Sequence, residues 1–202
     1  ANCIFVQVVR HPLYMIKQQA LNFENLTETA RDFTIYFEYQ SQEVPYYASG
    51  WEQHYVNSNP IEKAIYFINF MKKLNKEMSK EFTSKFGAKI LTIPFEAFVL
   101  DPIPWTSKLA QILETSSTES TIRVMGEQNV PRSKVADGID LDIYRRCGWV
   151  PGDKSLTEAQ ELSLRRQEFV SSCSAETIEI LDSLSKSYSD MLRTEHNIDL
   201  HQ

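Results

Sequence analysis

Basic residues without acidic neighbours mark the start of the chain. Residues 1–23 hold Arg10, His11 and Lys17 but no Asp or Glu. Arg10 directly follows an apolar run, residues 4–9, so it stands where a buried strand would end. Open α/β sheets bind ligands at the carboxyl ends of their strands, and a guanidinium there can grip a phosphate with two parallel hydrogen bonds. On position alone, an arginine paired with a nearby carboxylate is the more common role of such a residue, and an anion site is the alternative.

A second basic segment near the C-terminal end combines arginine with glycine. Residues 145–154, Arg-Arg-Cys-Gly-Trp-Val-Pro-Gly-Asp-Lys, include Arg146, Gly148 and Gly152. Glycine lets a backbone approach a phosphate closely and adopt positive φ. Alone, such a loop is more often a solvated turn. Its order in the chain after Arg10 favours a functional role.

The motif around Arg10 carries a resemblance to a known family. Val9-Arg10-His11-Pro12 after an apolar strand resembles the strand-Arg-x-Pro motif of sulfotransferases. In that family the arginine binds the 3′-phosphate of the donor, 3′-phosphoadenosine 5′-phosphosulfate, and a serine eight positions later assists it. Gln18, beside Lys17, occupies that position here. The segment Asn129-Val130-Pro131-Arg132 and the Leu…Leu…Tyr spacing of the last predicted helix resemble the bacterial and carbohydrate-type members.

Two later segments are similar to the same family. Residues 91–102, Leu-Thr-Ile-Pro-Phe-Glu-Ala-Phe-Val-Leu-Asp-Pro, resemble its Tyr-Glu-x-Leu…Asp-Pro turn, with Phe95 in place of tyrosine, and we interpret this turn as structural. The loop after Arg146 resembles the Arg-x-Gly segment that wraps the 3′-phosphate. The resemblance therefore implies five contacts to the donor, with no catalytic residue and no metal identified: Arg10, Gln18, Arg146, Cys147 and Gly148.

The resemblance also implies a fold. We expect an α/β protein with a three-layer parallel sheet flanked by helices, the P-loop nucleotide-kinase-like sulfotransferase fold, and a helix-rich C-terminal part. Residues 1–202 would form a single sulfotransferase-like domain, its C-terminal portion, because the glycine-rich phosphosulfate-binding loop and the usual His or Glu base have no counterpart in the chain. We expect both to lie upstream of Ala1.

The function implied is transfer of a sulfuryl group to a hydroxyl of a carbohydrate or small metabolite. An inactive sulfotransferase-like domain that serves as a binding or interaction module is the alternative, and the missing loop and Gln18 favour it. A related kinase would need a GxxxxGK[ST] motif and a magnesium-binding Asp, and neither is visible. Whether the chain forms a homodimer is left open.

Regular elements must position these residues. Strands are expected at residues 4–9, covered on both faces, and at 89–95. Between them, apolar residues recur every three or four positions after Pro60, which predicts a long helix capped by Asn59 or Ser58 and closed by Gly87. Strand, helix and strand in this order form a crossover unit with parallel strands.

The rest of the chain is predicted to be mainly helical. A short amphipathic helix is expected around residues 105–113, and residues 126–154 form a long irregular segment. Ser155 and Glu158 predict a capping box for a helix that ends near Val170, and Ser174 caps a last helix. His54 lies in an aromatic segment that is either an acceptor pocket or a partly buried loop.

Composition limits the class of protein. The net charge of −6 argues against a sequence-blind nucleic-acid binder. No run of about 18 apolar residues exists, so no membrane span is expected. The three cysteines are widely spaced without a CxxC pair, which argues against a zinc site and favours the cytoplasm, with the Golgi lumen as the alternative.

Overall fold

The computed structural model describes residues 4–28, 35–139, 142–146, 148, 150 and 152–196 of the chain. Helices dominate, and two small sheets are present among these residues. The elements in chain order are β1 (Ile4–Val9), α1 (Pro12–Glu28), β2 (Tyr36–Tyr39), β3 (Gln42–Pro45), the 3₁₀ turn η1 (Tyr46–Ala48), α2 (Glu52–Asn57), α3 (Pro60–Phe86), β4 (Lys89–Pro94), α4 (Phe95–Leu100), α5 (Ile103–Ile112), α6 (Glu119–Glu127), α7 (Asp142–Arg146), α8 (Glu158–Val170) and α9 (Ala175–His196). None of the described helices is long and apolar enough to cross a membrane.

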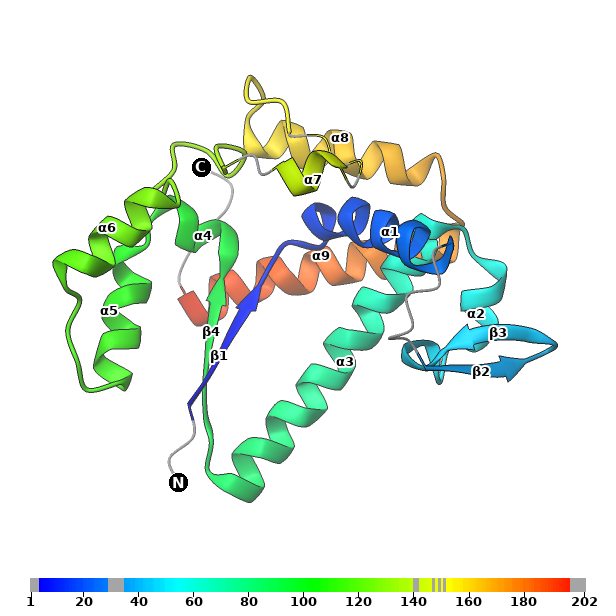
Figure 1. Ribbon diagram of the computed structural model, residues 1–202, viewed down its shortest axis with the longest axis horizontal. Coiled ribbons are helices and arrows are strands. Elements are labelled where there is room, and N and C mark those ends of the chain that lie inside the picture. Colours follow the sequence, from blue (N-terminus) through cyan, green and yellow to red (C-terminus); the bar gives the residue numbers. More distant parts are fainter. Residues whose placement is uncertain are drawn as a thin grey trace.

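The predicted crossover unit is confirmed. β1 pairs with β4 in parallel, in a register that sets Ile4 opposite Lys89 and Val9 opposite Pro94. The chain between the two strands includes α1 and α3, and α1 continues directly from the end of β1 (Figure 1). Both strands therefore end at the same edge, which is the edge where Arg10 begins the first loop.

The expected three-layer sheet is not shown, and the prediction that β1 is covered on both faces is wrong. Among the described residues the parallel sheet has two strands. Val6 and Val8 of β1 are 46% and 59% exposed, whereas Leu91, opposite Val6, is 4% exposed. Leu91 and Ile93 pack against Trp105 of α5, which therefore covers β4 but leaves β1 open. An apolar run shows that a strand can be buried, but it does not supply the neighbour that buries it.

The long helix α3 follows its local signals closely. The Asn59 side chain accepts hydrogen bonds from the backbone N–H groups of Ile61 and Glu62, both at 3.0 Å, and the Glu62 carboxylate accepts one from the Asn59 N–H in return. This capping box satisfies backbone donors that a helix start leaves free. Gly87 ends the helix in the left-handed conformation with φ of 60°, which glycine adopts without steric cost.

The main core lies where α1, α3, α8 and α9 meet. Ile16 of α1, Ile65 of α3, Phe169 of α8 and Leu181 of α9 are fully buried in one cluster. Figure 1 shows α9 passing behind the strands, α1 running on beyond the end of β1, and α3 running diagonally beside them. This cluster fixes α1 against α9, and thereby places the two elements that flank the end of β1.

A small hairpin and an aromatic cluster form a second unit that the sequence did not predict. β2 and β3 are antiparallel, and the two turn residues between them, Gln40 and Ser41, have positive φ without being Gly or Asn. The usual hairpin signal is therefore missing. The segment around His54 is helix α2, and the His54 ring stacks on Tyr66 at 4.2 Å between ring centres. The aromatic residues here build core, which favours the structural interpretation of this segment.

The predicted helices α8 and α9 are present, but the capping residues of α8 differ from those predicted. The segment expected to be irregular, 126–154, includes the end of α6 and the short helix α7. The capping box of α8 is formed by Thr157 and Gln160, two residues beyond the predicted pair Ser155 and Glu158. Ser174 accepts a hydrogen bond from the Thr177 N–H, as its predicted role as the cap of α9 requires.

Candidate functional site

Arg10 lies at the carboxyl end of β1, at the edge where open α/β sheets place their ligands. Its Nε donates to Oε1 of Glu96 at 3.2 Å, so the carboxylate-paired alternative is realised in part. Its two terminal amino groups make no hydrogen bond to any described residue, and 38% of the side chain is exposed. The guanidinium is thus held at one nitrogen and open at the other two.

Glu96, at the start of α4, is the buried anchor of this site. Only 1% of it is exposed, and its carboxylate accepts three hydrogen bonds: from Arg10 Nε, from the His11 N–H at 3.2 Å and from the Tyr188 hydroxyl at 2.7 Å. A buried carboxylate is tolerated when its oxygens are satisfied in this way. Burial, and next the Glu96 charge, raise the pKa of Tyr188, so its hydroxyl keeps the proton that it donates.

His11 caps α1 and is kept neutral. Its Nδ1 accepts a hydrogen bond from the Leu13 N–H at 3.2 Å, and its ring meets Tyr14 and Tyr188 edge-on. The side chain is 5% exposed, and burial lowers its pKa to about 4. Since Nδ1 is already an acceptor, His11 acts here as a helix cap that fixes the first turn after Arg10.

A second buried carboxylate lies across Tyr14. Glu161 of α8 is 8% exposed and receives two hydrogen bonds on Oε1, from Arg165 Nε at 3.0 Å and Nη2 at 2.7 Å. A β-carbon on Gly152 would lie 2.8 Å from that oxygen, so glycine at this position makes room for the pair. Burial, followed by the charges of Glu96 and Glu161, raises the pKa of Glu158.

Arginine and aromatic side chains alternate through the site. The Arg10 Cζ lies 4.3 Å from the ring centre of Phe95 and 5.6 Å from that of Tyr14. Arg132 lies 5.7 Å from the Phe95 ring centre, and Arg165 lies 5.1 Å from that of Tyr14. Ring faces attract such cations and orient planar guanidinium groups. Three positive groups therefore gather near the ends of β1 and β4.

The other predicted contacts lie along α1 and α7. Gln18 of α1 donates from Nε2 to Asn22 Oδ1 at 3.1 Å, and Arg146 is exposed at the end of α7. Gly148 has φ of 81°, and a β-carbon there would lie 3.6 Å from the Leu21 side chain, so this glycine approaches α1 one turn beyond Gln18. Cys147 lies outside the described residues. No hydrogen bond or ion pair between described residues joins Arg10 to Gln18 or Arg146.

The sequence did not single out several residues that surround Arg10. Glu96 and Phe95 belong to a motif that we interpreted as structural, and Arg132 follows an Asn-Val-Pro segment that we used as a family marker. Tyr188 lies 92 positions from Glu96, so no local pattern links them. The one available signal was Phe95-Glu96 at the end of a second parallel strand, beside which Arg10 would stand.

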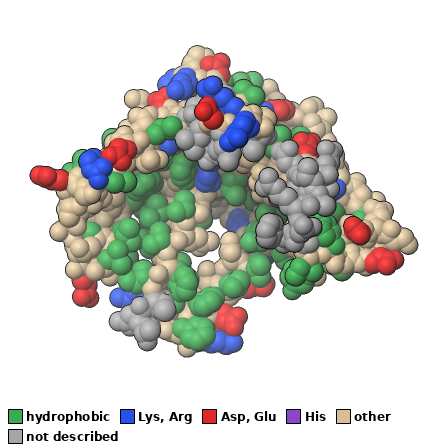
Figure 2. Space-filling model, in the orientation of Figure 1, with side chains coloured by type: hydrophobic (Ala, Val, Ile, Leu, Met, Phe, Trp, Pro, Cys, Tyr) green, Lys and Arg blue, Asp and Glu red, His purple; other side chains and the backbone are tan. Residues whose placement is uncertain are grey.

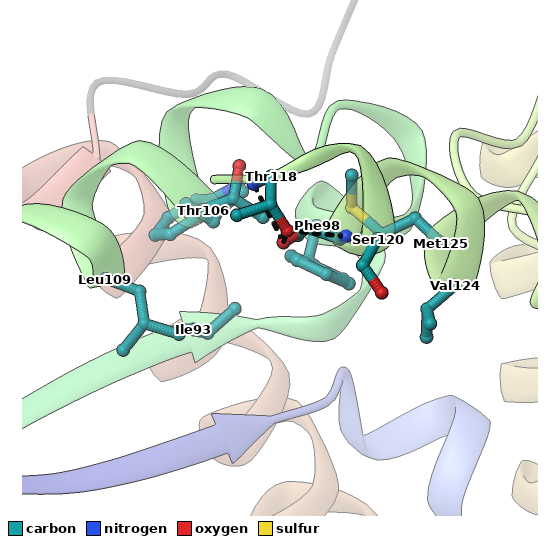
Figure 3. Close-up of a pocket in the computed structure, with 10 residues that line it drawn as sticks. Ile93, Phe98, Thr106, Leu109, Thr118, Ser120, Val124 and Met125 are labelled. Atoms are coloured by element: carbon teal, nitrogen blue, oxygen red, sulfur yellow. Dashed lines mark hydrogen bonds between the residues drawn. The ribbon is translucent and has the colours of Figure 1, made fainter. Parts of the chain in front are cut away.

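A separate apolar cavity of about 550 Å³ lies between β4, α4, α5 and α6. Figure 3 shows Ile93, Phe98, Leu109 and Val124 around it, and Figure 2 shows a hollow lined largely by apolar side chains on this face. None of the side chains that line it is titratable. The cavity offers apolar contact but neither acid nor base, and no three His, Cys, Asp or Glu among the described residues gather to hold a metal.

Comparison of the chain with protein-family models, with curated proteins and with solved structures finds no match. The site must therefore be interpreted from its own geometry. That geometry is an exposed guanidinium at the end of a parallel strand, held by a buried carboxylate and accompanied by further arginines.

Proposed function

We propose that this chain is the donor-binding part of a sulfotransferase, in which Arg10 holds the 3′-phosphate of 3′-phosphoadenosine 5′-phosphosulfate. The observation that carries the proposal is the state of Arg10 at the carboxyl end of β1. Glu96 takes its Nε, which leaves both terminal amino groups to bind a phosphate in parallel. A carboxylate on Nε orients the guanidinium without occupying its outer edge.

The neighbouring elements support the same proposal. Gly148 lies close to Leu21 of α1, the helix that also bears Gln18. In sulfotransferases these two regions meet at the 3′-phosphate. The proposed fold is the P-loop nucleotide-kinase-like one, and the β1–β4 pair with its crossover helices supplies its parallel part.

The reaction proposed is transfer of a sulfuryl group to a hydroxyl of a carbohydrate or small metabolite. The bond from sulfur to the bridging oxygen of the donor breaks, a bond to the acceptor oxygen forms, and the hydroxyl proton leaves to a base. Such transfers depend on positioning and on stabilisation of developing charge. Arg10 would contribute by anchoring the remote 3′-phosphate, whose binding energy orients the reacting sulfate.

Calorimetric titration with adenosine 3′,5′-bisphosphate tests the donor site. We expect binding that is at least tenfold tighter than that of adenosine 5′-monophosphate and that Arg10→Ala abolishes. Equal affinity for the two nucleotides, or binding that survives Arg10→Ala, would reject the donor-site proposal.

A sulfotransferase-like binding domain without activity is the second candidate. Gln18 favours it, because its amide is engaged with Asn22 in the place where the family carries a serine. Transfer of labelled sulfate from the donor to a panel of sugars and phenols separates the two. Tight binding of the bisphosphate without any transfer by the full-length protein would favour the binding domain.

A further inference from the structure

Arg132 is the arginine of this site whose charge has the least compensation. It has no carboxylate within ion-pair distance among the residues that the structure describes. Its Nε and Nη1 donate to the backbone carbonyls of Asn129 at 3.3 Å and Val135 at 3.2 Å, and Nη2 donates to no described residue. Arg165, at the other end of the row, is neutralised by Glu161. A further anion contact would therefore come from Arg132 rather than from Arg165.

Phe95 brings Arg132 and Arg10 together. Their Cζ atoms lie 5.7 and 4.3 Å from the centre of the same ring, so they are within about 10 Å of each other. Burial, and next the positive charge of Arg10, lower the pKa of Arg132. The acidic side chain that acts in the opposite direction, Asp137, is itself bonded to the Lys134 N–H at 3.0 Å. The two positive charges of Arg10 and Arg132 are thus held near each other, and of the two only Arg10 has an ion pair with a described carboxylate, Glu96.

The surrounding backbone is shaped to hold the Arg132 side chain. The Arg132 N–H donates to the Val99 carbonyl at 2.7 Å, which ties this loop to α4. A β-carbon on Gly138 would lie 3.1 Å from Nη1 and 3.3 Å from Cζ of Arg132. Any larger residue at position 138 would press on the guanidinium. The loop therefore fixes a half-buried cation near Arg10 that pairs with no carboxylate of the described residues.

We propose that Arg10 and Arg132, held on the Phe95 ring, form an arginine pair that binds one multiply charged oxyanion, a phosphate or sulfate group. Such an anion removes the repulsion between the two guanidinium groups and accepts hydrogen bonds from their open amino groups. The inference deepens the proposed function and rests on it for the nucleotide to which the phosphate belongs. The anion chemistry itself rests on the arginine pair.

Titration of the full-length protein with inorganic phosphate, sulfate and adenosine 3′,5′-bisphosphate tests the pair. We expect Arg132→Gln to lower the affinity for each oxyanion by about tenfold to a hundredfold, which is the effect of losing a charge-assisted contact. Arg132→Lys keeps the charge but not the planar fork, so it should restore only part of the affinity. Arg123→Gln is the matched control, because Arg123 pairs with Glu127 on the surface of α6; its affinities should equal those of the wild type.

Gly138→Ala is a second variant, in case Arg132→Gln lowers the affinity only by disturbing the structure of the loop. It keeps both arginines and displaces only the guanidinium, so it should weaken phosphate binding severalfold while thermal unfolding stays unchanged. An unchanged affinity in Arg132→Gln, or no binding of any oxyanion by the wild type, would overturn the arginine pair.

The two proposals fail separately. If the bisphosphate binds through Arg10 and ignores Arg132, the arginine pair is wrong and the donor site stands. If phosphate and sulfate bind through both arginines but the bisphosphate gains nothing over them, the pair stands and the sulfotransferase proposal falls.

Discussion

Lowering the pH should weaken the protein through His11. Burial lowers the pKa of His11 from its ordinary value of 6.5 to about 4, so the unfolded chain binds a proton in this range that the folded chain refuses. The stability contributed by neutral His11 is therefore complete above about pH 6.5 and is lost as the pH falls towards 4. Protonation would also turn Nδ1 from the acceptor of the Leu13 N–H into a donor, which removes the cap of α1.

The size of the effect follows from linkage. With these two pKa values, the free energy of unfolding should fall by about 2 kcal/mol between about pH 7.5 and pH 5, and by about 3 kcal/mol once both states are protonated. His11→Asn is the informative variant, because asparagine can cap the helix through its side-chain oxygen and has no proton to gain here.

Urea unfolding at several pH values between about 5 and 7.5 measures the difference. Glu158, whose pKa is raised, titrates in both proteins and drops out of the comparison. The wild type should lose about 2 kcal/mol more than His11→Asn over this range. Parallel curves for the two proteins would show that burial does not hold His11 neutral.

Two substitutions test the packing that positions the site. Phe169→Ala, at a side chain with no exposed surface in the core between α1 and α9, should cost about 3–5 kcal/mol in urea unfolding, and a loss below about 1 kcal/mol would contradict the packing described. Asn59→Ala removes the acceptor of the Ile61 and Glu62 N–H groups and the donor to the Ser172 carbonyl, and it should cost about 1–2 kcal/mol. The neutral comparison is Asn75→Ala on α3, because the exposed Asn75 side chain makes no hydrogen bond to any described residue.

Local signals in the sequence predicted the helices and strands whose ends depend only on neighbouring residues. Asn59, Pro60 and Gly87 define a helix through contacts within one turn of each end, and the structure places the ends of α3 there. The two apolar runs were predicted to be strands from their own residues, whereas their parallel pairing followed from the strand–helix–strand order of the chain. The exposed Val6 and Val8 could not be anticipated, because the exposure of a strand depends on which distant helix covers it.

The candidate site also has a part that the sequence predicts locally and a part that depends on distant segments. The position of Arg10 at a strand end follows from the apolar run and Pro12, and the structure agrees. Its carboxylate partner, Glu96, lies 86 positions after Arg10, and Tyr188, which also donates to Glu96, lies 92 positions further on. Hydrogen bonds over such separations leave no periodic pattern in the sequence. Arg132 was not predicted as a site residue, because only the folded structure shows that it contacts the same Phe95 ring as Arg10.

The Glu96 anchor has a consequence for the order of events in folding. Its three hydrogen bonds join residue 96 to residues 10, 11 and 188, so two long loops must close before the carboxylate is satisfied. Closing long loops is slow and is rewarded only when the last contact forms. During synthesis α9 emerges after α1 and α4, and until α9 docks, Glu96 lacks the Tyr188 hydroxyl. Anion binding by a nascent chain would therefore report that α9 has docked.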